Sequence, residues 1–379
     1  MKKLLIIAFS DLENDPRVYR QIHYFSQFYQ VTAIGWDPIH IDSVRFIPIK
    51  HTSRTIFQRI LRAFQYKLHR FETIYWSIYH YQEVMDLLEN ESFDIIIAND
   101  LDTLPFALKI AKNAKVVLDT HEYAPRHFEN VWSWRFFFQE FNKYLCKTYM
   151  NRCDAIITVS QGVADEYKKN YDIDPVVITN AADYVELEPG PVNDSNIKII
   201  SHGISNPSRN LELLIETADY LDERFHLDLM LIPTFPRYYK KLQDMAAKRK
   251  NVRIIPAVPR KEIISTIHAY DLSLLVFKPT TINIRYGLFN RFFESLQARL
   301  GIVTGPLQYS HVDIIDKYSC GLITQNYTPA DIAKQLNHLT SGDIMKYKEH
   351  ACIAARVFTA QNEIEKMGEL VKNLFKEGT

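Results

Sequence analysis

The sequence lacks the features that mark several large classes of protein. Its 379 residues contain only four cysteines, and no two of them form a Cys-x-x-Cys pair, so neither a zinc site nor a disulfide framework is predicted. Lys+Arg 45 balances Asp+Glu 45, which leaves no net charge to attract nucleic acid. No run approaches the ~18 consecutive apolar residues of a membrane span. We therefore expect a reduced protein of the cytoplasm.

Short apolar runs alternate with helical patterns along the whole chain, which is typical of βαβ units with parallel strands. The polar, Pro- and Gly-containing stretch 186–196 divides this pattern, and we place a linker there. The prediction is an α/β protein with two Rossmann-like doubly wound parallel-sheet domains, 1–185 and 197–354. The predicted strands are Leu4–Phe9, Val31–Ile34, Ile95–Ala98, Val116–Asp119, Ala155–Val159, Val176–Thr179, Ile197–Ser201, Leu227–Ile232, Val252–Pro256, Leu272–Phe277, Ile302–Thr304 and Gly321–Thr324.

The most informative segment is 285–305. It contains a loop at Gly287, a helical pattern that carries Glu294, and an apolar strand bounded by glycines. A second segment places Asn206 and Pro207 at a helix start, followed by Arg209. Glycine loops and helix N-termini let backbone N–H groups approach a phosphate. Both segments therefore indicate a phosphate-binding edge of a sheet.

These motifs resemble those of the retaining family 4 glycosyltransferases, which have the GT-B fold. Residues 285–305 resemble that family's Tyr-Gly-Leu-Pro-Asn-Lys-Leu-Phe-Glu pattern, and residues 15–20, Asp-Pro-Arg-Val-Tyr-Arg, resemble a signature of one branch. The resemblance implies two domains that face each other across a cleft, and a C-terminal helix, about 355–379, that returns to the first domain. It also implies a UDP- or GDP-linked sugar donor and no metal or other cofactor.

The resemblance assigns the donor site to the second domain. Tyr286 departs from the family pattern because many relatives carry Glu there, and Ile204 replaces a second Arg of the phosphate loop. Arg285 and Arg291 are the candidates to complete that loop. The residues expected at the donor diphosphate are Arg209, Arg291, Gly203 and Gly287. Those expected at the ribose and donor sugar are Glu294, Asn290 and Tyr286. Those expected beside the nucleobase are Val258 and Pro259.

In the first domain the resemblance points to His121, which follows a predicted strand. The family carries a catalytic His there, and an imidazole can hydrogen-bond a sugar hydroxyl. The acceptor side is assigned to Arg17, Arg20 and Asp100. Asp100-Leu101-Asp102 has the form of a metal-binding Asp-x-Asp, but its flanking residues resemble a loop of family 4 enzymes, so no metal is expected.

Two aromatic segments suggest a possible membrane contact. In a helix over 54–76, apolar residues fall on one face and Arg59, Arg62, Lys67 and Arg70 on the other. Such a helix can lie on an anionic membrane or pack against a core with its basic face in water. The segment 132–138, Trp-Ser-Trp-Arg-Phe-Phe-Phe, would fit beside a lipid-linked acceptor.

The resemblance implies a retaining transferase that moves a hexose-type sugar to a glycan or lipid-linked acceptor. The expected setting is cell-surface polysaccharide or lipopolysaccharide assembly, in the cytoplasm or on the inner face of the plasma membrane. Two alternatives stay open. A GT-B sugar-nucleotide epimerase would need no acceptor, and a catalytically silent GT-B subunit would bind nucleotide or glycan without turnover.

Overall fold

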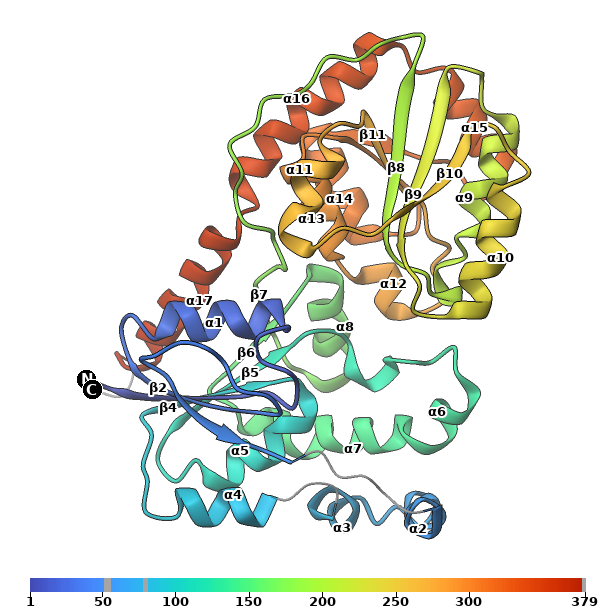
Figure 1. Cartoon of the computed structure of the whole chain (residues 1–379). Coiled ribbons are helices and arrows are strands. Elements are labelled where there is room, and N and C mark those ends of the chain that lie inside the picture. The colour runs from blue at the N-terminus through green and yellow to red at the C-terminus, as the bar shows by residue number, and fades with distance from the viewer. Residues whose placement is uncertain (51–55, 78–80, 377–379) are drawn as a thin grey trace. The chain divides into compact units, whose positions relative to one another are not determined.

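The computed structural model describes residues 1–50, 56–77 and 81–376, with side chains from residue 61 onward in the second range. The chain forms two compact units, Met1–Thr179 with Ile364–Thr379, and Asn180–Glu363. Each unit is a parallel sheet with helices on both faces (Figure 1). This confirms the predicted fold class. The stretch 186–196 belongs to the second unit, and residues 364–379 belong to the first.

The sheet of the first unit has seven parallel strands in the order β3-β2-β1-β4-β5-β6-β7. Its strands are β1 Lys3–Ile7, β2 Gln30–Gly35, β3 Arg45–Pro48, β4 Ile95–Asn99, β5 Lys115–Thr120, β6 Ala155–Thr158 and β7 Val176–Val177. The sequence did not predict β3, because only two apolar residues lie between Arg45 and Pro48. An edge strand does not need a longer apolar run, because it pairs on one side only, here with β2.

Helix α1, Pro16–Phe25, shows how local sequence builds this unit. Asp15 accepts hydrogen bonds from two backbone N–H groups of the first turn, and Pro16 takes the first helical position. Val18, Ile22 and Phe25 follow at helical spacing and are buried against the sheet. The remaining helices are α2 Ile56–Lys67, α3 Phe71–Trp76, α4 Tyr81–Leu88, α5 Leu104–Ile110, α6 Trp132–Phe137, α7 Gln139–Tyr149, α8 Gln161–Tyr171 and α17 Ala360–Leu374, which crosses the unit boundary.

The prediction of one continuous helix over 54–76 is wrong. The helix ends at Lys67, His69 adopts a left-handed φ of 53°, and a second helix begins at Phe71. The face predicted for a single helix is therefore divided between α2 and α3. Residues 54 and 55, and the side chains of 56–60, lie outside the described part of the chain.

The second unit has a six-stranded parallel sheet in the order β10-β9-β8-β11-β12-β13. Its strands are β8 Ile197–Ile204, β9 Phe225–Ile232, β10 Val252–Pro256, β11 Leu272–Leu275, β12 Gly301–Thr304 and β13 Gly321–Ile323. Its helices are α9 Glu212–Thr217, α10 Pro236–Ala246, α11 Ile263–Ile267, α12 Ile282–Tyr286, α13 Asn290–Gln297, α14 Tyr309–Tyr318, α15 Pro329–Asn337 and α16 Ser341–Val357.

Both sheets reverse their strand order once, next to β1 in the first unit and next to β8 in the second. In open α/β sheets, ligands bind outside the carboxyl ends of the strands at such a reversal. We therefore expect ligands to bind at these two edges.

Candidate active site

Two arginines meet at the carboxyl end of β8. Gly203 has a φ of +123°, and a Cβ atom there would lie 2.7 Å from Nη2 of Arg291 and 3.5 Å from Nη1 of Arg209. The absent side chain thus makes room for both guanidinium groups beside the backbone. Arg209 lies at the end of a short turn, Pro207–Arg209, that Asn206 caps through the N–H of Ser208.

In the part of the chain that the structure describes, neither guanidinium has an acidic partner. Arg291 is 6% exposed, and its guanidinium lies over the ring of Phe277, 4.9 Å from its centroid. Burial lowers the pKa of Arg209 to about 10. Within the described residues, neither arginine forms an ion pair with Asp or Glu, unlike Arg249 and Arg253 of the same unit. Buried cations are normally paired, so this arrangement is suited to an anionic ligand.

Glu294, which follows Arg291 on α13, contacts a residue that the motifs did not indicate. Nε2 of His202 lies 2.8 Å from Oε2 of Glu294, and the His202 side chain is almost fully buried at the end of β8. The second carboxylate oxygen of Glu294 has no such contact to His202. His202 therefore orients a carboxylate that can still accept a hydrogen bond from a hydroxyl.

The other predicted donor residues occupy the same edge of the second unit. Asn290 is exposed at the first position of α13, and Gly287 ends α12. Tyr286 stacks on Tyr309 with ring centroids 5.6 Å apart. Val258 and Pro259 form the loop after β10, where Pro259 is exposed. Arg285 is also exposed, so of the two candidates for completing the phosphate loop, Arg291 is the one beside Gly203.

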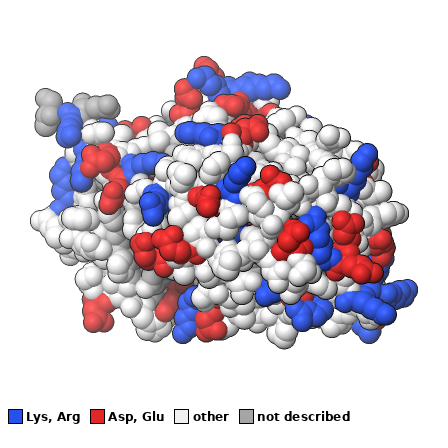
Figure 2. Space-filling model, turned by 90° about the horizontal axis from the view of Figure 1, so that it is seen from above, with Lys and Arg blue, Asp and Glu red and all other residues white. Residues whose placement is uncertain are grey.

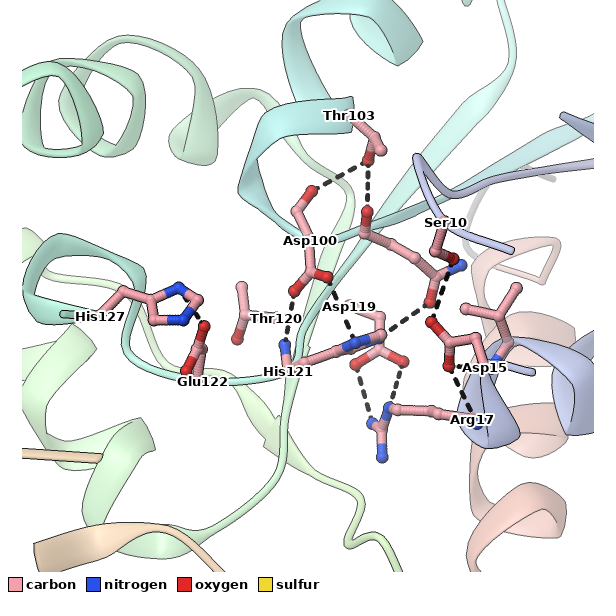
Figure 3. Close-up of polar contacts among 12 residues, drawn as sticks. Ser10, Asp15, Arg17, Asp100, Thr103, Asp119, Thr120, His121, Glu122 and His127 are labelled. Atoms are coloured by element: carbon pink, nitrogen blue, oxygen red, sulfur yellow. Dashed lines mark hydrogen bonds and ion pairs between the residues drawn. The ribbon is translucent and has the colours of Figure 1, made fainter. Parts of the chain in front are cut away.

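In the first unit, the predicted residues surround a buried ion pair that the sequence did not predict. Arg17 donates from Nε and Nη2 to the two carboxylate oxygens of Asp119, at 2.7 and 2.8 Å (Figure 3). Asp119 is 0% exposed. Although burial acts in the opposite direction, Arg17 keeps the pKa of Asp119 below its usual value. The guanidinium of Arg17, expected on the acceptor side, is thus bound to Asp119, and Arg20 lies partly buried on the same helix.

His121 and Asp100 come together at the ends of β4 and β5. Nδ1 of His121 lies 3.3 Å from Oδ2 of Asp100, and the backbone N–H of His121 donates to the other carboxylate oxygen (Figure 3). Asp100 adopts φ 67° and ψ 156°, a strained conformation for a residue with a side chain. Burial and the neighbouring Asp100 carboxylate raise the pKa of Asp102 to about 7. Backbone strain such as that at Asp100 often accompanies a functional site.

The described residues also bear on metal binding and on membrane contact. Among them, no group of three or more His, Cys, Asp or Glu side chains is placed to hold a metal ion. No helix in the same part of the chain is long and apolar enough to span a membrane. On the face seen in Figure 2, acidic and basic side chains are interspersed, with no large area of one sign.

Comparison with known proteins relates this chain to glycosyltransferases. A model of Glycosyltransferase Family 4 matches residues 42–185. The solved structure of a glycosyltransferase from Rickettsia africae is 14% identical, covers 99% of each chain and has a TM-score of 0.71. Sucrose-phosphate synthase from Thermosynechococcus elongatus is 12% identical, covers 100% of each chain and has a TM-score of 0.74. The chain thus has the GT-B fold, and residues 42–185 match the model of Glycosyltransferase Family 4.

A third solved structure similar to this chain is Anabaena HepE in complex with UDP-glucose. It is 12% identical, covers 98% of this chain and 100% of its own, and has a TM-score of 0.71. No curated protein matches the sequence. At such identities the structural likeness establishes the fold, while the role of each residue rests on the geometry of this chain.

Sequence reasoning did not find His202, Gln21 or Asn99, and it left the role of Asp119 open. A polar residue that ends an otherwise apolar strand is the signal that could have found His202 and Asn99. Gln21 had no such signal, because a polar residue on the first helix of a βαβ unit is normally exposed. Here it is 1% exposed and donates a hydrogen bond to Asp119.

Proposed function

We propose that this glycosyltransferase moves a hexose-type sugar from a nucleoside-diphosphate sugar, UDP- or GDP-linked, to a glycan or lipid-linked acceptor. Retention of configuration and a role in cell-surface polysaccharide biosynthesis are parts of the same proposal. The observation that carries it is the pair of guanidinium groups of Arg291, which is buried, and Arg209, which is partly buried; they lie beside Gly203 and have no acidic partner among the described residues. A diphosphate would supply the missing negative charge.

The proposal gives each donor contact a physical role. Arg209 and Arg291 neutralise the leaving diphosphate, and the glycine backbone at Gly203 lets it approach closely. Glu294, held by His202, accepts hydrogen bonds from the ribose hydroxyls. Two related solved structures support a nucleotide donor, since HepE is described with UDP-glucose and the trehalose-6-phosphate protein from E. coli with UDP-2-fluoro glucose. The chemistry needs no metal, because the arginines provide the positive charge.

In the first unit, His121 and Asp100 are assigned to the sugar being transferred and to the acceptor. A half-exposed carboxylate accepts a hydrogen bond from an acceptor hydroxyl, and the imidazole beside it holds a proton. The departing phosphate would take the acceptor proton, so no enzymic nucleophile is needed.

We also propose that α2 and α6 contact an anionic membrane surface that carries the acceptor. On α2, Leu61 is 49% and Phe64 62% exposed, and on α6 Trp132 is 66% exposed. Nζ of Lys67 lies 4.0 Å from the ring centroid of Phe136, which joins the two helices in one basic and aromatic surface. Aromatic rings suit the headgroup region, and lysine near anionic lipid gains about 1 kcal/mol.

Calorimetric titration with UDP, GDP and ADP tests the donor site. One nucleotide should bind, and binding should be lost in Arg209→Met but retained in Arg249→Met, whose arginine is paired with Asp219 instead. Release of that nucleotide from its sugar conjugate then separates a transferase from a silent subunit. If none of the three nucleotides binds, the proposed donor site is refuted.

Vesicle flotation tests the membrane surface. The protein should float with vesicles containing phosphatidylglycerol and not with pure phosphatidylcholine, and Phe64→Glu should reduce flotation. Ile353→Glu is the matched control, because Ile353 is 56% exposed on α16 of the other unit. An equal loss of flotation in both variants, or no binding of the wild-type protein to anionic vesicles, would contradict this part of the proposal.

A further inference from the structure

A chain of buried amides connects Asp119 to His121. Nε2 of Gln21 lies 2.6 Å from Oδ2 of Asp119, and Nδ2 of Asn99 lies 2.9 Å from Oε1 of Gln21. Nε2 of His121 then lies 3.2 Å from Oδ1 of Asn99. Gln21 and Asn99 are each 1% exposed, so water does not compete for these positions. The chain crosses from α1 to the ends of β4 and β5 within the first unit.

The charge of Asp119 determines the direction of every hydrogen bond in this chain. Asp119 is held ionised by Arg17, and an ionised carboxylate can only accept. The amide nitrogen of Gln21 must therefore face Asp119, which turns its oxygen toward Asn99. That oxygen requires the nitrogen of Asn99, which turns the oxygen of Asn99 toward His121. The orientation of both amides thus follows from the ion pair rather than from the amide atoms themselves.

We infer that Gln21 and Asn99 are positioning residues that hold the proton of His121 on Nε2. A lone pair on Nε2 would face the lone pairs of the Asn99 oxygen, leaving two buried acceptors without a donor. The Asp100 carboxylate attracts a proton to Nδ1, but its side chain is 49% exposed, so water can donate to it, whereas no water reaches the oxygen of Asn99. The neutral ring therefore favours Nε2–H. Nδ1 is then the nitrogen that gains or loses a proton, and it lies beside the Asp100 carboxylate, which can accept a hydrogen bond from a substrate hydroxyl.

This consequence for catalysis rests on the proposed function, whereas the tautomer itself does not. Long-range proton–nitrogen NMR of the full chain, labelled with nitrogen-15 in histidine, measures which ring nitrogen carries the proton. His121→Gln identifies the His121 signals by their loss. Under alkaline conditions, where the ring is neutral, we expect the proton on Nε2. A proton on Nδ1 in the wild-type protein would overturn the inference, whatever the enzyme transfers.

Asn99→Leu removes the last acceptor of the chain while keeping the volume of the side chain. The tautomer is then set by Asp100 alone, and we expect the proton to move to Nδ1. Thr103→Val is the matched control, because it also deletes hydrogen bonds, from Oγ1 of Thr103 to the backbone carbonyl oxygens of Asn99 and Asp100, without changing the side-chain amides. It should leave the proton on Nε2. An unchanged tautomer in Asn99→Leu would overturn the inference.

Gln21→Met provides a second test should Asn99→Leu fail to fold. It frees the Asn99 amide to turn, so the preference for Nε2–H should fall to a mixture of tautomers. With an active donor and acceptor, both variants should lower kcat by at least about tenfold with little change in KM for the donor, because the donor contacts of the second unit remain. A change in KM alone, with the tautomer intact, would assign these residues a merely structural role.

Discussion

Replacing Arg209 by methionine should stabilise the protein while abolishing nucleotide binding. Arg209 is a largely buried cation that forms no ion pair among the described residues, and its guanidinium lies 5.8 Å from the ring centroid of Phe289. Methionine retains the aliphatic stem and removes the charge. A change that stabilises the empty enzyme and disables the site is characteristic of a group retained for its ligand.

The magnitude follows from the lost hydration of the guanidinium. A pKa of about 10, against an ordinary 12.5, corresponds to ~3 kcal/mol of charge desolvation. The lost contact with Phe289 offsets about 0.5–1 kcal/mol of this. We expect a net gain of roughly 1–2 kcal/mol, or about 2–6 °C in the melting temperature of the second unit. Because the pKa of Arg209 is lower in the folded state, the charged guanidinium destabilises the folded protein fully below about pH 10 and less above it. The stability gained in Arg209→Met should therefore be constant from about pH 6 to 9.

The assay is urea and thermal unfolding of the wild type and Arg209→Met, each with and without the nucleotide that the wild type binds. The wild type should gain stability from the nucleotide, and the variant should gain none. Arg249→Met is the control, because Arg249 forms a two-fold contact with Asp219 and its loss should destabilise the second unit. If Arg209→Met is less stable than the wild type by 1 kcal/mol or more, our account of an unpaired buried charge is refuted.

Three further predictions follow from other contacts. Gly203→Ala should cost about 2–4 kcal/mol and weaken nucleotide binding, because a Cβ atom would overlap Arg291 at a φ of +123°; unchanged calorimetric affinity would contradict this. Arg17→Met should cost about 3–5 kcal/mol in urea unfolding at pH 7, since it leaves Asp119 buried without its partner. The pKa of Asp119 is lowered in the folded state, so the contribution of the pair is present above about pH 4 and lost as the pH falls through the folded value; the stability difference between the wild type and Arg17→Met should therefore shrink as the pH falls below about 4. Asp100→Gly should raise stability by about 1 kcal/mol because it relieves the strain at φ 67°, yet it should lower turnover; a fall in thermal stability would argue against strain at this position.

Much of the fold could be predicted from the sequence because buried parallel strands are continuous apolar runs. Every predicted strand corresponds to one in the structure, and only β3 was missed, since an edge strand carries little apolar sequence. The single helix over 54–76 was wrong because its periodicity continues through His69, where the backbone turns to a positive φ. Periodicity describes which residues share a face, and it does not detect a turn between two helices of similar phase.

The motifs located the candidate site but not its partners. Arg209 and Glu294 stood out because glycine loops and a helix start leave a local pattern. The contacts of Arg17 with Asp119 and of His202 with Glu294 join residues 102 and 92 positions apart, and no local pattern records them. By itself, the sequence determined the alternation of strands and helices and the residues at the strand ends, because these depend on neighbours along the chain. Only the tertiary structure decided which charges are paired and which ring nitrogen carries a proton, because burial and long-range contacts determine both.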